Sequence, residues 1–141
     1  MQLYGSRLGS AAQNISWSEC PSKRNYEVAT GTITPNPPII GEFFDLEIDV
    51  KFSDYANVVG NFISVKVTPD GQTLPIPLYA QDFPTSYPGI YIAGDRYNDG
   101  IAWLLPTFAP IGHYNFQVVV HGPNKDNDNY VCLEADFEVQ A

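Results

Sequence analysis

Apolar and polar residues alternate strictly from residue 44 to residue 52. The apolar positions of this segment are Phe44, Leu46, Ile48, Val50 and Phe52. A period of two indicates a β-strand with one buried face and one wet face. Residues 34–41, just before it, contain three prolines, which cannot continue a hydrogen-bonded ladder, and end at Gly41, which permits a turn. We therefore expect a strand to enter this proline hinge and a long amphipathic strand to leave it.

The same alternation predicts strands over residues 61–68, 113–121 and 130–139. Their apolar faces carry Ile63, Val65, Val67, Tyr114, Phe116, Val118, Val120, Val131, Leu133, Ala135, Phe137 and Val139. Residues 54–60 are expected to form a turn or a short connection, and Pro69-Asp70-Gly71 a tight turn. Weaker strands are expected at residues 15–19, 28–34, 72–79, 90–93 and 101–105. This succession of strands and turns predicts an all-β sandwich.

Residues 80–111 are less regular, rich in proline and strongly aromatic. Their aromatic residues include Phe83, Tyr87, Tyr91, Tyr97, Trp103 and Phe108. Two interpretations remain open at this point. The aromatic side chains either close over a bound molecule or pack as ordinary residues at the edge of the core.

Composition and charge narrow the class of protein. The chain has 141 residues, which suits one domain, with 12 Pro and 11 Gly among many aromatic residues. Its formal net charge is −9 with only seven Lys and Arg, which form no patch. This argues against nucleic-acid binding and against attraction to anionic membrane surfaces. No apolar run approaches the roughly 18 residues of a membrane span.

The two ends of the chain bear on its location. Residues 1–14 have no apolar core of signal-peptide length, so we expect a flexible leader, processed or engineered, followed by one domain over residues 15–141. Asn14-Ile15-Ser16 is a glycosylation sequon and points weakly to the secretory route. Cys20 and Cys132 are either free thiols or a bridge. Both have the parity of polar positions, so a bridge would join the first and last strands outside the core unless a bulge reverses the parity.

The residues that catalysis or metal binding would need do not come together in the sequence. His113 and His121 are about 26 Å apart along one strand, so they cannot share a metal, and both are expected to be solvated. No serine lies in a GxSxG elbow and no glycine-rich phosphate loop is present. Residues 126–129 offer oxygen ligands but not the spacing of a calcium loop, which favours a plain turn. We expect no enzyme activity, no metal and no cofactor.

Four short motifs occur in an order that is similar to a known family. They are Trp17-Ser18-Glu19-Cys20, residues 34–41 with the sequence TPNPPIIG, residues 110–114 with the sequence PIGHY, and residues 130–139 beginning YVCL. Together they span nearly the whole chain, and this series resembles the ML lipid-recognition domain family. Its members include the Niemann–Pick type C sterol carrier, the ganglioside activator, group 2 mite allergens and fungal phosphatidylglycerol/phosphatidylinositol transfer proteins.

The resemblance implies an immunoglobulin-like sandwich of two antiparallel sheets that splay to hold a lipid tail. It also implies a disulfide between Cys20 and Cys132 and a secreted or lumenal location, endosomal, lysosomal or vacuolar. The implied cavity lining is Phe44, Leu46, Ile48, Val50, Phe52, Ile63, Val65, Val67, Tyr114, Phe116, Val118, Val120, Leu133 and Phe137. The implied cavity mouth is Phe83, Tyr87, Tyr91, Arg96, Trp103 and Phe108.

The chain departs from the family by lacking two further disulfides, one after the first strand and one near residues 80–88. The mouth should therefore be less constrained, and Arg96 is the nearest candidate for contact with an anionic head group. The leading hypothesis is a monomeric, soluble lipid-binding and transfer module for a phospholipid, fatty acid or sterol, with a membrane or receptor protein as a further partner. The alternative is an immunoglobulin-like structural or protein-interaction module with a closed core.

Overall fold

The computed structural model describes residues 16–68 and 79–139. These residues form eight strands: β1 Trp17–Glu19, β2 Tyr26–Thr34, β3 Phe43–Phe52, β4 Ala56–Thr68, β5 Tyr79–Tyr91, β6 Arg96–Leu104, β7 Gly112–His121 and β8 Asn129–Val139. Within these ranges there is no helix, and so none long and apolar enough to cross a membrane. The leader, Asn14, and the expected turn and strand over residues 69–78 lie outside the described residues.

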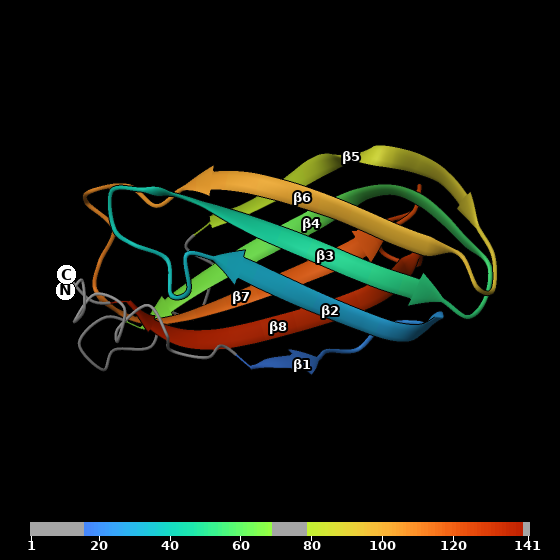
Figure 1. Cartoon of the computed structure of the whole chain (residues 1–141), viewed down its shortest axis with the longest axis horizontal. Helices are drawn as coiled ribbons and strands as arrows, with labels where there is room; N and C mark the ends of the chain where they lie inside the picture. Colours follow the sequence, from blue (N-terminus) through green and yellow to red (C-terminus); the bar gives the residue numbers. More distant parts are fainter. Residues whose placement is uncertain (1–15, 69–78, 140–141) are drawn as a thin grey trace, which may run out of the picture.

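The strands form two antiparallel sheets packed face to face. The larger sheet has the order β1-β8-β7-β4-β5 and the smaller has the order β2-β3-β6. In Figure 1 the smaller sheet lies in front of the larger one, with β3 between β2 and β6. The predicted all-β, two-sheet sandwich is confirmed.

The core lies between the two sheets, where the alternating faces of the strands meet. On β3 the apolar face is almost completely buried, from Phe44 at 2% exposed to Phe52 at 0%. All fourteen residues assigned to a cavity lining belong to one buried cluster in this layer. Burying one such side chain stabilises the fold by about 1.5–3 kcal/mol, so this layer holds the sandwich together.

The proline hinge links the smaller sheet to a loop beyond β6. The chain turns at Gly41, whose φ of 86° suits glycine, as expected from the sequence. The Gly41 amide then donates to the Leu105 carbonyl at 2.6 Å, and the Leu105 amide donates to the Glu42 carbonyl at 3.1 Å. These two hydrogen bonds fix the start of the loop that follows β6.

Cys20 and Cys132 form a disulfide that closes a separation of 112 residues. The bridge connects the segment after β1 to β8 and packs with Val119 and Phe62 in a small cluster of its own. Its cysteines lie apart from the main core, on the outer face of the larger sheet, as their parity predicted. The bridge therefore joins strands without occupying the space between the sheets.

Two expectations about strands were wrong. Residues 54–60 are not a simple connection, because β4 begins at Ala56 and continues through a register shift between Val58 and Gly60. The segment over residues 80–111 is also more regular than expected, since it contains β5 and β6. Both are edge strands, and an edge strand tolerates prolines such as Pro84 and Pro88 because one side of it needs no ladder.

His121 is buried at 8% exposed, which contradicts the expectation that both histidines are solvated. The register shift beside His121 leaves Tyr130 of β8 as the extra residue, so His121 keeps its expected place on the outer face of the larger sheet. It is buried there because Asp82 of β5, which also binds Lys125, covers the ring. The His121 ring lies 3.2 Å from Asp82 Oδ1 through Nε2 and 2.9 Å from the Gly122 carbonyl through Nδ1. His113 is half-exposed beside Asp136.

Candidate functional site

A pocket of about 610 Å³ opens at one end of the sandwich. It lies where β6 ends, where the loop of residues 105–110 follows, and where β7 begins. Its walls are Val65, Tyr79, Trp103, Leu104, Leu105, Pro106, Phe108, Ala109, Pro110 and Tyr114. We call this end, with Phe44 and Trp103, the pocket end, and the opposite end, with Lys51 and Arg96, the far end.

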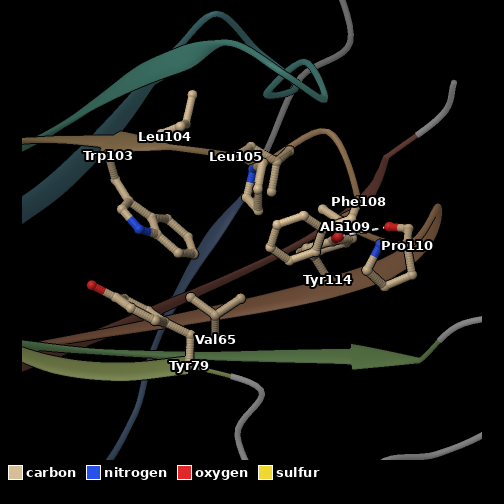
Figure 2. A pocket seen from close by; sticks show the side chains of 10 residues that line it. Val65, Tyr79, Trp103, Leu104, Leu105, Phe108, Ala109, Pro110 and Tyr114 are labelled. Carbon is tan, nitrogen blue, oxygen red and sulfur yellow. Dashed lines mark hydrogen bonds between the residues drawn. The ribbon is translucent and has the colours of Figure 1, made fainter.

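Both sheets contribute to the pocket walls. Val65, Tyr79 and Tyr114 come from the larger sheet, whereas Trp103 and Leu104 come from the smaller one. Figure 2 shows Trp103 above Tyr79 on one side, and Leu105, Phe108 and Tyr114 on the other. The Tyr79 and Trp103 rings stack at a centroid distance of 4.3 Å, and this stack spans the two sheets. The pocket is therefore an apolar space between the sheets.

The pocket side chains have few polar atoms, and the two tyrosine hydroxyls among them already donate hydrogen bonds within the protein. The Tyr114 hydroxyl donates to the Pro110 carbonyl at 2.6 Å, and the Tyr79 hydroxyl donates to Gln81 Oε1. Burial raises the pKa of both phenols above the usual value, because the phenolate would lose its hydration. Both side chains therefore stay neutral at physiological pH and leave the pocket uncharged.

Large apolar side chains surround the pocket end at the surface. Phe108 is 85% exposed, Phe43 67% and Leu104 40%. Phe43 and Leu104 are neighbours on the outer face of the smaller sheet, since they are paired in register. An apolar pocket with an apolar rim is suited to a hydrocarbon ligand.

A second feature inside the sandwich is a buried polar cluster between β4, β5 and β6. Asp99 Oδ2 accepts hydrogen bonds from Asn61 Nδ2 at 3.1 Å and from the Tyr97 hydroxyl at 3.0 Å. The hydroxyls of Tyr97 and Thr85 lie 2.6 Å apart, and the Ser86 amide donates to Asp99 Oδ2 at 3.3 Å. The cluster ties the two sheets together beside their edge strands, away from the pocket.

The structure brings together only some of the residues expected at the site. Of the expected cavity lining, Val65 and Tyr114 line the pocket, and the other twelve pack in the core. Of the expected mouth, Trp103 and Phe108 line the pocket. Phe83 and Tyr91 pack against the core from β5.

Tyr87 and Arg96 do not lie at the pocket. Arg96 pairs in register with Lys51 at the far end and lies 3.8 Å from Asp49. It is seven residues from Trp103 along β6, or about 23 Å in an extended strand. Tyr87 is 60% exposed on β5.

Sequence reasoning missed several pocket residues, namely Tyr79, Leu104, Leu105, Pro106, Ala109 and Pro110. Most of them belong to the loop after β6, where no alternation exists to assign an inward face. The signal that could have found them is the pair of prolines enclosing an apolar segment, because such a loop cannot extend the sheet and must fold back over it.

Polar chemistry elsewhere in the described ranges does not form a metal site. No group of three or more His, Cys, Asp or Glu side chains in residues 16–68 and 79–139 is arranged to hold a metal ion. A shallow groove of about 420 Å³ lies on the outer face of the smaller sheet, beside Thr32, Asp45 and Glu47. Unlike the pocket at the end of the sandwich, it carries the carboxylates of Asp45 and Glu47 in its wall.

Comparison with known proteins gives similarity of fold only. No family model matches the sequence, and no curated protein matches it. Among solved structures, a Niemann-Pick type C2 protein from the Japanese carpenter ant is 11% identical with a TM-score of 0.54. The match covers 89% of this chain and 99% of the ant protein.

Two further structures are similar over most of their length. Chicken MD-1 complexed with lipid IVa is 11% identical with a TM-score of 0.51, and the match covers 88% of each chain. The C-terminal domain of wzt is 14% identical with a TM-score of 0.54, covering 94% of this chain and 81% of the other. The chain therefore shares its fold with two proteins of the family that its motifs resemble, the ant protein and MD-1, and also with the C-terminal domain of wzt.

Proposed function

We propose that this protein binds the hydrocarbon part of a lipid in the pocket at the end of its sandwich, and carries that lipid as a transfer module. The observation that carries the proposal is the pocket itself, an apolar space of about 610 Å³ with walls from both sheets. Ligand pockets in proteins commonly measure about 300–1,000 Å³. An acyl chain or a sterol is the ligand class that such walls favour.

The energetics of burial support a lipid that is held with few polar contacts. Each CH₂ group removed from water contributes about 0.8 kcal/mol. Ten buried methylenes would then contribute about 8 kcal/mol before the cost of ordering the chain. A pocket with two engaged tyrosine hydroxyls and otherwise apolar walls can therefore hold such a ligand.

Two further findings agree with this function. One protein with a similar fold, chicken MD-1, was solved in complex with lipid IVa. The disulfide between Cys20 and Cys132 is typical of proteins that mature in an oxidising compartment, which fits a secreted or lumenal carrier. We further propose that the carrier acts as a monomer and meets a membrane or a receptor protein at delivery.

The direct test is mass spectrometry of the natively purified protein and of its organic extract. We expect a lipid adduct at a stoichiometry of one, or uptake of one lipid when phospholipid, fatty acid and sterol are offered. A protein that carries no adduct and takes up none of the three would contradict the proposal.

Two variants that each replace an alanine by tryptophan test whether the lipid binds in the pocket. Ala109 lines the pocket, so Ala109→Trp should fill it and reduce lipid uptake at least tenfold. Ala102 is exposed on the outer face of β6, so Ala102→Trp adds the same side chain outside the pocket and should leave uptake unchanged. Equal uptake by the two variants would show that the lipid binds elsewhere.

A second candidate function is a protein-interaction module, and one observation favours it. Three large apolar side chains are exposed on β5 and just after it, namely Tyr87, Ile90 and Ile92 at 58–63%. An interface there predicts that Tyr87→Ala with Ile90→Ala weakens binding to a partner protein and leaves lipid uptake unchanged. Loss of lipid uptake in that double variant would count against a separate interface.

A further inference from the structure

The charges around the pocket bear on which lipids it accepts, provided that it binds lipids as proposed above. Six of the seven basic residues lie in the described part of the chain, and none of them lines the pocket. Five of the six are within 4 Å of a carboxylate elsewhere: Lys23, Arg24, Lys51, Arg96 and Lys125. None of these five is available to a ligand at the pocket end.

Lys66 is the sixth described basic residue, and it faces away from the pocket. Its neighbours Val65 and Val67 are 0% and 1% exposed and point into the sandwich. Because side chains alternate along a strand, the exposed Lys66 points outward from the larger sheet. The sequence between β4 and β5, residues 69–78, contains no Lys or Arg either.

Carboxylates, in contrast, lie close to the pocket end. The backbone of Glu42 is hydrogen-bonded to Leu105, which lines the pocket, and the Glu42 side chain is exposed. Asp45 is exposed on the outer face of β3, directly opposite Ala102. With a net charge of −9, the protein repels anions here, and an anion partly removed from water would gain no counterion.

The polar atoms that the pocket does offer suit an uncharged group. In Figure 2 the Tyr79 oxygen and the Trp103 indole nitrogen point to the same side, away from Phe108. The Tyr79 hydroxyl donates its proton to Gln81 but can still accept a hydrogen bond, and the indole N–H is a donor. Both groups are uncharged at neutral pH, so neither can neutralise a phosphate or a carboxylate.

We propose that the pocket selects lipids whose polar group is uncharged, such as a long-chain alcohol, a sterol or an acylglycerol, and discriminates against lipids with a phosphate or carboxylate. The selectivity follows from the absence of a cation among the described residues at the pocket, combined with the nearby carboxylates. It replaces the expectation that Arg96 contacts an anionic head group, because Arg96 lies at the far end beside Asp49.

The test compares two ligands with the same hydrocarbon chain, hexadecanol and hexadecyl phosphate, delivered from the same cyclodextrin carrier at neutral pH. We expect hexadecanol to bind at least tenfold more tightly. Equal or tighter binding of hexadecyl phosphate would overturn the selectivity and leave the lipid-binding function standing. Binding of neither ligand by the natively folded protein would overturn the function, and the selectivity with it.

A charge at the rim provides a second measurement. Phe108 lines the pocket and is 85% exposed, so it accepts a polar side chain with little effect on folding. Phe108→Lys should bind hexadecyl phosphate several-fold more tightly than Phe108→Gln, the matched uncharged variant, while the two variants bind hexadecanol equally. Equal binding of the phosphate by both variants would show that charge does not decide the selectivity.

Discussion

Trp17 and Gly31 close one side of the sandwich through a contact that only glycine permits. A Cβ built on Gly31 would lie 2.8 Å from Cε2 of the Trp17 ring, closer than real contacts. Trp17 belongs to β1 in the larger sheet and Gly31 to β2 in the smaller one, so the ring covers the gap between two edge strands.

Gly31→Ala should therefore destabilise the protein by about 1–3 kcal/mol, because the ring must move out of its place. The free energy of unfolding from urea titration measures this effect. The control is Gly100→Ala in β6, where the added Cβ meets nothing closer than 3.8 Å. A similar loss of stability in both variants would mean that the Trp17 contact is not the cause.

The buried phenol of Tyr97 should make the stability of the fold depend on pH in the alkaline range. Burial raises the pKa of its phenol well above the usual value near 10, and the nearby Asp99 adds to this. Above pH 10 the unfolded state loses this proton while the folded state keeps it, so stability should fall by about 1.4 kcal/mol per pH unit from this group. Tyr97→Phe should show a shallower fall between pH 10 and pH 11.

At the scale of elements, the polar cluster links β6 to β4 and β5. Asp99→Ala removes a charged acceptor that Asn61 Nδ2 and the Tyr97 hydroxyl share, in residues that are 0% exposed. Asn61 Nδ2 keeps only its second bond, to the Tyr97 hydroxyl at 3.2 Å, so one buried N–H loses its partner. We expect a cost of about 2–4 kcal/mol in the free energy of unfolding. The control Asp49→Ala removes an exposed carboxylate from the same sheet and should cost less than about 1 kcal/mol.

The disulfide acts on β1 and β8 without contacting the pocket. Replacing both Cys20 and Cys132 by serine should lower stability by up to about 5 kcal/mol, since the bridge restricts a long loop in the unfolded chain. Lipid uptake at low temperature should remain, because the bridge packs with Val119 and Phe62 outside the main core. Loss of uptake in a variant that is still folded would contradict this separation.

The strands were predictable wherever one face is buried and the other is wet. The alternation from Phe44 to Phe52 identified β3, and similar patterns identified β7, β8 and most of β4. The sequence failed at β5, because prolines indicate breaks, and only the sheet order shows that β5 is an edge strand. It failed for His121 because Asp82, which covers that ring on the outer face of the larger sheet, is distant in the sequence.

At the scale of the whole molecule, a bound lipid should stabilise the folded state. A ligand that binds only the folded protein adds about 2.7 kcal/mol at one hundred times its dissociation constant. Hexadecanol should therefore raise the melting temperature of the native protein. Ala109→Trp, whose pocket is filled, should show no such increase, and an equal increase would place the ligand elsewhere.

The position of the pocket was the least predictable feature. The alternation shows which residues face inward, but the same pattern describes a filled core and a lined cavity. Twelve of the fourteen expected lining residues pack in the core. There the Phe116 ring contacts the Phe44 ring at a centroid distance of 5.4 Å and the Phe137 ring at 5.0 Å. The pocket depends on how the loop of residues 105–110 folds over the sheets, and that conformation has no periodic signal.

The loop of residues 105–110 is under a different constraint from the strands. The strands hold the fold through ladders and buried faces, so most substitutions there disturb register or packing. The loop contributes half of the pocket wall and takes part in no ladder beyond Leu105. A handful of loop substitutions can therefore reshape the pocket while the strands keep the same scaffold.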